Sequence, residues 1–149
     1  MHKPKNKIIP IILSGGSGKR LWPISSDSLP KQYISLIEEK TMLQITIERL
    51  AGIENISTPI IICNKEHKSL VNNQLKEIGE NNAEILLEPI GRNTAPAITA
   101  AASYINNKKN DPNIILLVLS TDHMISDISS FHRSIEVATD MAAKDHLII

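Results

Sequence analysis

The sequence predicts an α/β fold, a Rossmann-like and mostly parallel β-sheet with helices on both faces. Short runs rich in β-branched residues alternate with longer segments whose apolar residues recur at helical spacing. One run, residues 114–119, holds six consecutive apolar residues, which is typical of a parallel strand buried on both faces. A glycine-rich loop directly follows the first such run, as in α/β folds that bind ligands at the ends of their strands.

The first half of the chain predicts two strands and two helices in alternation. Residues 8–13 are apolar and mostly β-branched, which favours a strand. Residues 41–50 carry apolar side chains partly on one side of a helix, and residues 59–63 predict the second strand. Residues 65–78 predict a helix with one apolar face, and Gly79 is suited to follow its C-terminus.

The second half continues the same pattern. Residues 84–87 predict a third strand and residues 94–105 an alanine-rich helix. The fourth strand, residues 114–119, is followed by a helix at residues 129–143. Residues 147–149 are apolar and predict the beginning of one more strand.

Length, charge and cysteine content narrow the functional classes. A chain of 149 residues can form one domain with a buried core, but a strand cut short predicts a domain that is incomplete at its C-terminus. Lys plus Arg and Asp plus Glu both number 16, and this balance argues against a non-specific binder of nucleic acid or membrane surfaces. Cys63 is the only cysteine and lies in an apolar run, so we expect it in the core rather than in a disulfide or a catalytic site.

The N-terminal apolar run predicts neither a secretion signal nor a membrane anchor. Residues 8–13 are too few to span a membrane or to form the core of a signal peptide, and Pro10 interrupts them. We therefore expect a cytoplasmic protein.

The segments that follow the predicted strands are the candidate ligand site, because parallel sheets bind ligands at the carboxyl ends of their strands. Three of these four segments carry unusual chemistry. The segments are residues 14–20, 64–67, 88–94 and 120–123.

The first segment is a glycine loop with two cations. Its glycines allow successive N–H groups to approach an anion, and Lys19 and Arg20 add positive charge, which suits a pyrophosphate or triphosphate. Leu13 and Arg20 break the Walker A pattern, and Leu21 breaks the dinucleotide-binding pattern. The alternative is a simple strand-to-helix turn. Lys31, in a Pro-Lys-Gln string, supplies a further cation to the same region.

The segment after the third strand combines a carboxylate, a glycine and an amide. Gly91 permits close approach of a planar ligand, Asn93 offers both a donor and an acceptor, and Thr94 can cap the following helix. The alternative is a structural loop in which Arg92 and Glu88 pair by charge.

Asp122 follows the fourth strand and is well placed to hold Mg²⁺. The alternative is a helix cap or a solvated aspartate. We interpret His123 as a packing residue or a neighbour of the metal ligand rather than as a general base.

Three strings together give a family resemblance that covers essentially the whole chain. They are Gly-Gly-Ser-Gly-Lys-Arg-Leu-Trp-Pro-Ile-Ser followed by Leu-Pro-Lys-Gln-Tyr, Glu-Pro-Ile-Gly-Arg-Asn-Thr-Ala-Pro-Ala, and Asp-His. This set resembles the sugar-1-phosphate nucleotidyltransferases, and most closely the bacterial mannose-1-phosphate guanylyltransferases, including forms fused to a phosphomannose isomerase. The resemblance implies that residues 1–149 are the N-terminal, nucleotide-binding portion of such a domain.

The resemblance also implies the reaction and the roles of the site residues. GTP and mannose 1-phosphate would give GDP-mannose and pyrophosphate, with Mg²⁺ as the cofactor on Asp122. Arg20 and Lys31 would contact phosphate and act with Asp122 in catalysis. The remaining residues would bind the nucleotide: Ser14, Gly15, Gly16 and Gly18 at the phosphates, and Glu88, Gly91, Arg92, Asn93 and Thr94 near the base and ribose.

The chain departs from the family pattern at several positions. Lys19 replaces a small hydroxyl residue, Ser26 replaces an arginine, and Ser120 and Thr121 replace a Pro-Ala pair. We expect these changes to affect phosphate affinity and the strand exit that directs Asp122.

The family's sugar-binding Thr-Gly-Tyr-Gly segment and a second metal-binding aspartate would lie beyond Ile149. We therefore expect weak or no transferase activity from this chain alone, with the missing half in a second chain or the chain in a homo-oligomer. A non-catalytic nucleotide-binding remnant, or a related enzyme for another nucleotide or sugar 1-phosphate, is the alternative.

Overall fold

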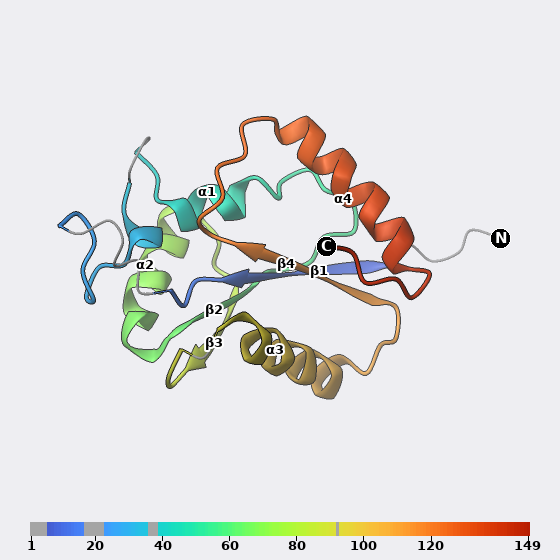
Figure 1. Cartoon of the computed structure of the whole chain (residues 1–149), viewed down its shortest axis with the longest axis horizontal. Coiled ribbons are helices and arrows are strands. Elements are labelled where there is room, and N and C mark those ends of the chain that lie inside the picture. Colours follow the sequence, from blue (N-terminus) through green and yellow to red (C-terminus); the bar gives the residue numbers. More distant parts are fainter. Residues whose placement is uncertain (1–5, 17–22, 36–38, 92) are drawn as a thin grey trace.

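A four-stranded parallel sheet forms the centre of the molecule. The computed structural model describes residues 6–16, 23–35, 39–91 and 93–149. The strands are β1 (Lys7–Leu13), β2 (Ile60–Asn64), β3 (Glu84–Glu88) and β4 (Ile114–Ser120), in the order β3-β2-β1-β4. All three pairings are parallel, so the carboxyl ends of the four strands lie at one edge of the sheet (Figure 1).

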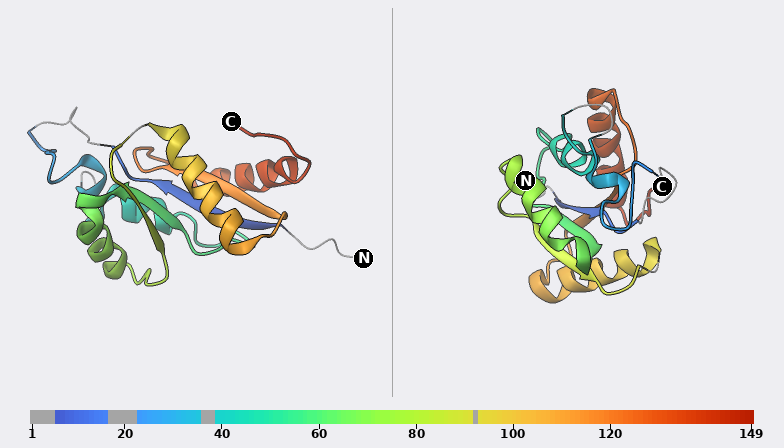
Figure 2. Two further views of the ribbon diagram at one scale, coloured as in Figure 1. Left: turned by 90° about the horizontal axis from the view of Figure 1, so that it is seen from below. Right: turned by 90° about the vertical axis from the view of Figure 1, so that its left-hand side faces the viewer.

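Helices cover both faces of this sheet, as the sequence predicted. Figure 1 shows α1 (Met42–Glu48) and α4 (Ile128–Ala142) on one side and α3 (Thr94–Lys109) on the other. The left view of Figure 2 shows α3 lying across its face of the sheet. Helix α2 (Lys68–Glu77) packs on the same face as α1. Short 3₁₀ helices, η2 (Lys31–Tyr33) and η3 (Lys65–His67), complete the described elements.

The core consists of two layers, one on each face of the sheet. Ile12 and Ile61 point to the α1 and α2 side, whereas Ile11 and Ile60 point to α3, as the two-residue period of strands requires. Helix α3 presents small or aliphatic residues at four-residue intervals to its layer: Ala97, Ala101 and Ile105. The sequence-predicted apolar runs therefore supply both layers.

Cys63 belongs to the first layer and is fully buried, which confirms its predicted place in the core. Burial raises the pKa of its thiol to about 11, so the thiol is protonated at neutral pH. No helix within the described part of the chain is long and apolar enough to cross a membrane.

Three local predictions were wrong. Strand β4 is half-buried rather than buried on both faces, because it is an edge strand whose one neighbour among the described strands is β1. Residues 147–149 form no strand, since they pair with none of the described strands, and Leu147 is 91% exposed. Thr94 does not cap α3; it is the first residue of the helix, and Asn93 precedes it with a positive φ of 65°.

Candidate functional site

The predicted site segments meet at the carboxyl edge of the sheet. Leu13 at the end of β1 is level with Ser120 at the end of β4, and Asn64 is level with Glu88. The backbone N–H of Ser14 still donates to the carbonyl of Ile62 at 2.8 Å, so the glycine loop begins where the ladder ends. The sheet thus brings the segments after β1, β3 and β4 to one edge.

Two buried polar side chains hold the start of the glycine loop. The Gln32 amide donates to the carbonyl oxygens of Ser14 and Gly16, at 3.0 and 2.8 Å. The Tyr33 hydroxyl donates to the Ser14 carbonyl at 2.9 Å and accepts from the Ser14 hydroxyl at 3.0 Å. Within the described residues, the N–H groups of Gly15 and Gly16 have no acceptor of their own. The start of the loop is therefore held through the carbonyls of Ser14 and Gly16.

The support for the loop continues into the core. The Gln74 amide donates to the Tyr33 carbonyl at 3.0 Å, and the Thr41 hydroxyl donates to Gln74 at 2.7 Å. Burial raises the pKa of Tyr33 to about 12, which keeps its hydroxyl a hydrogen-bond donor at neutral pH. Sequence reasoning missed Gln32 and Tyr33 as functional residues. The available signal was a polar pair placed directly after the Pro-Lys string.

Glu88 lies directly against the glycine loop. A Cβ atom placed on Gly15 would lie 2.5 Å from Oε2 of Glu88, so the carboxylate occupies the space that a side chain at Gly15 would need. A Cβ on Gly91 would lie 3.9 Å from the Gly15 carbonyl, an ordinary contact. No hydrogen bond or ion pair reaches the Glu88 carboxylate from the described residues, and desolvation raises its pKa.

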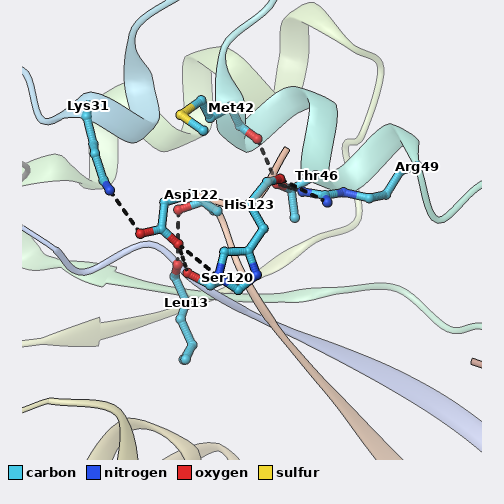
Figure 3. Close-up of polar contacts among 9 residues, drawn as sticks. Leu13, Lys31, Met42, Thr46, Arg49, Ser120, Asp122 and His123 are labelled. Carbon is cyan, nitrogen blue, oxygen red and sulfur yellow. Dashed lines mark hydrogen bonds and ion pairs between the residues drawn. The ribbon is translucent and has the colours of Figure 1, made fainter. Parts of the chain in front are cut away.

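Asp122 forms the polar centre of the site (Figure 3). Its Oδ2 accepts from the Lys31 ammonium at 2.9 Å, across 91 residues of sequence, and its Oδ1 accepts a short hydrogen bond from the Ser120 hydroxyl. Nε2 of His123 is 3.8 Å from Oδ1. The hydrogen bonds from Ser120 and then Lys31 lower the pKa of Asp122 to about 2, so this carboxylate is ionised at neutral pH.

The donor set around Asp122 is compatible with Mg²⁺. Protein sites bind this ion through one or two carboxylates and leave the remaining positions to water and substrate phosphates. Asp122 meets that need with an ionised side chain that is 40% exposed. Among the described residues, no group of three or more His, Cys, Asp or Glu could form an all-protein metal cage. A metal ion here would compete with Lys31 for Oδ2.

The other predicted residues lie at the start of α3, beside Asp122 or outside the described residues. Asn93 precedes α3, and Thr94 is the first residue of that helix. His123 is not a packing residue, because its side chain is 74% exposed. Gly18, Arg20 and Arg92, together with the proposed Arg92–Glu88 pair, lie outside the described residues.

Residues 9–149 match the family model described as nucleotidyl transferase. The chain belongs to this family. The resemblance to sugar-1-phosphate nucleotidyltransferases, predicted from the three strings, is thereby confirmed.

Two relatives carry this relationship further. The chain is 45% identical over 141 residues to a mannose-1-phosphate guanylyltransferase of Escherichia coli, an alignment that covers 95% of this chain and 29% of the relative. It is 45% identical over 142 residues to the alginate biosynthesis protein AlgA of Pseudomonas putida, with the same coverage of 95% and 29%. The chain therefore spans less than a third of the length of these curated relatives.

Solved structures confirm the fold. A mannose-1-phosphate geranyltransferase of Thermus thermophilus superposes with a TM-score of 0.74 at 29% identity, over 88% of this chain and 37% of that one. A mannose-6-phosphate isomerase of Helicobacter pylori gives a TM-score of 0.73 at 30% identity, over 93% of this chain and 47% of that one. The α/β architecture predicted from the sequence is thus that of the nucleotide-sugar transferases.

Proposed function

We propose that this chain is the nucleotide-binding portion of an enzyme that makes GDP-mannose and pyrophosphate from GTP and mannose 1-phosphate. The observation that carries the proposal is the meeting of Lys31 and Asp122 beside the glycine loop. A cation and an ionised carboxylate, at the edge of the sheet where ligands bind, suit a phosphate and its metal ion. The named relatives, the guanylyltransferases, support the choice of substrates.

The reaction needs positioning and charge neutralisation more than acid–base chemistry. A sugar phosphate is already anionic at neutral pH, so its oxygen can attack the α-phosphorus of GTP in line without a strong base. The bond to the pyrophosphate then breaks. Mg²⁺, held by Asp122, would neutralise the phosphate oxygens. Lys31 would leave Oδ2 of Asp122 when the metal enters, and would then stabilise the leaving pyrophosphate together with Arg20.

Glu88 is our candidate for recognition of the base. A carboxylate only accepts hydrogen bonds, and guanine presents two neighbouring donors, N1–H and N2–H, on one edge. Adenine has an unprotonated N1 at the matching position. A desolvated carboxylate without a described partner is destabilised until such donors reach it, which favours GTP over ATP. Ser14, Gly15, Gly16, Gly18, Gly91, Arg92, Asn93 and Thr94 complete the proposed nucleotide site.

Calorimetric titration of the chain with GTP and with ATP, each with and without Mg²⁺, tests the proposal. We expect binding that prefers GTP and is strengthened by Mg²⁺. Lys31→Met should weaken both forms of GTP binding, because it removes a phosphate contact. Lys40→Met is the matched control, since Lys40 pairs with Glu48 outside the site. A folded chain that binds neither nucleotide would disprove the nucleotide site and leave a relict fragment of such an enzyme. Binding of GTP and ATP with equal affinity would disprove the preference for guanine.

A further inference from the structure

Arg49 is a buried cation that the proposed reaction does not use. It ends helix α1 and is 6% exposed, yet no carboxylate among the described residues pairs with it. Its Nε is buried without a hydrogen-bond partner in the described part of the chain. Burial of an unpaired guanidinium is costly, and desolvation lowers its pKa. Such a residue needs a reason beyond packing.

The contacts of Arg49 lead to the segment that carries Asp122 (Figure 3). Nη1 of Arg49 donates to the backbone carbonyl of His123 at 3.2 Å. On the other side of Asp122, the Thr121 hydroxyl donates to the carbonyl of Leu13 at 3.2 Å. Asp122 thus lies between two residues that are each anchored to a different element, α1 on one side and β1 on the other.

The guanidinium itself is held in place. Nη2 donates to the Thr46 hydroxyl, whose own proton goes to the Met42 carbonyl at 2.8 Å. The Phe131 ring of α4 lies 5.8 Å from the guanidinium carbon, within the range of a cation–π contact. Nε2 of His132 and the Arg49 carbonyl are 2.7 Å apart, which ties the end of α1 to α4. Arg49 is therefore fixed on both its side chain and its main chain.

We propose that Arg49 is a positioning residue that fixes the backbone at His123 and thereby sets how well the neighbouring Asp122 holds a metal ion. This inference rests on the proposed nucleotide site. Only a guanidinium can donate to the His123 carbonyl and the Thr46 hydroxyl at once in a planar fork. A lysine at this position could reach one of the two oxygens, and a methionine neither.

The test separates metal-dependent from metal-independent binding in Arg49→Met, Arg49→Lys and the unchanged chain. GTP is titrated by calorimetry with and without Mn²⁺. We expect Arg49→Met to weaken binding about tenfold with Mn²⁺ and to leave metal-free binding unchanged, in line with losses seen when support of a metal ligand is removed. Arg49→Lys should fold as the unchanged chain does. Its Mn²⁺-dependent GTP binding should lie between that of Arg49→Met and that of the unchanged chain. Equal losses with and without Mn²⁺ would mean that Arg49 serves packing alone, and the proposal would be wrong.

Arg133→Met is the control, because Arg133 is exposed on α4 and donates to Ser130. It removes the same charge without touching residues 121–124, so both forms of GTP binding should match the unchanged chain. A loss of Mn²⁺-dependent binding in Arg133→Met would show that charge, not position, matters, and would overturn the proposal.

Backbone ¹⁵N relaxation on the unliganded protein keeps the inference testable if the nucleotide proposal fails. We expect Arg49→Met to lower the order parameters of residues 122–124 and to leave those of the strands unchanged. Order parameters that stay unchanged at residues 122–124 would overturn the role of Arg49. A chain that binds no GTP, but shows this local change, would disprove the nucleotide site and retain the anchoring by Arg49.

Discussion

The two carboxylates at the edge of the sheet differ in how the folded protein prepares them. Asp122 accepts hydrogen bonds from Ser120 and Lys31, and these lower its pKa to about 2. Glu88 has no such donor among the described residues, and desolvation raises its pKa. The contrast teaches that Asp122 is kept as an anion in the free protein, whereas the described residues supply no hydrogen-bond donor to Glu88. We therefore assign Asp122 to a cation and Glu88 to a hydrogen-bond donor.

Removing the charge of Asp122 should have the largest effect. Asp122→Asn takes away a direct ligand of the proposed metal ion, so we expect the Mg²⁺-dependent part of GTP binding to fall by about 100-fold or more, because loss of an outer partner of a metal ligand already costs up to about 100-fold. Calorimetry with and without Mg²⁺ measures it. Asp140→Asn, on the exposed face of α4, is the control and should bind as the unchanged chain does. If Asp122→Asn kept its response to Mg²⁺, the two carboxylates would not divide their roles as proposed.

A methyl group at Gly15 should disturb Glu88 and leave Asp122 unchanged. In Gly15→Ala the new Cβ would meet Oε2 of Glu88, so the carboxylate must move away. The loss of one hydrogen bond to a charged group, about 1.5 kcal/mol, should lower the preference for GTP over ATP about tenfold. Competition between the two nucleotides measures this ratio.

Gly16→Ala is the matched control for that experiment. No atom of the described residues lies within 4 Å of a Cβ atom at Gly16, so Glu88 would keep its place. Whatever the substitution does to overall affinity, the ratio of GTP to ATP binding should not change. If the ratio of GTP to ATP binding were the same in Gly15→Ala and Gly16→Ala, Glu88 would not be the residue that distinguishes the two bases.

Loosening the segment before Asp122 should affect the metal response and not the choice of base. Thr121→Val removes the hydroxyl that donates to the Leu13 carbonyl. A neutral hydrogen bond contributes about 1 kcal/mol, so we expect Mg²⁺-dependent GTP binding to weaken about fivefold while the ratio of GTP to ATP stays constant. Thr99→Val is the control, since Thr99 makes the equivalent bond to a carbonyl within α3. A changed base preference in Thr121→Val would couple the two carboxylates.

The sequence was enough to predict the sheet, its helices and the edge at which the site lies. Apolar runs such as residues 114–119 and helical spacing depend on local periodicity, which a single sequence displays. The same run could not reveal that β4 is half-buried, because burial of a strand depends on which strands lie beside it. The strings around Gly15, Lys31, Glu88 and Asp122 predicted which residues gather at the edge of the sheet. They did not predict which of these side chains contact one another.

The contacts within the site required the structure. Lys31 meets Asp122 across 91 residues, and Arg49 reaches His123 across 74. Both pairs arise because α1 and η2 pack over the ends of β1 and β4. The periodicity of a single sequence does not reveal this packing. In the sequence Arg49 resembles a solvated arginine at the end of a helix. Likewise, the sequence does not predict the two hydrogen bonds that Gln32 donates to the glycine loop.

Replacing Glu88 by glutamine should give the smallest effect. It tests the difference between Glu88 and Asp122 in the protein without ligand. The pKa of Glu88 is raised in the folded state, so its contribution favours folding below the ordinary pKa of glutamate and is lost as the pH rises through the raised value. The glutamine side chain in Glu88→Gln stays neutral, so at pH 7 the free energy of unfolding of this variant should be slightly higher than that of the unchanged chain. The gain should be below about 1 kcal/mol, because water screens a half-exposed group. Urea unfolding at pH 7 and at pH 4 measures the difference, which should shrink at the lower pH. A variant less stable than the unchanged chain at pH 7 would mean that the carboxylate already has a partner in the free protein, and Glu88 would then belong with Asp122.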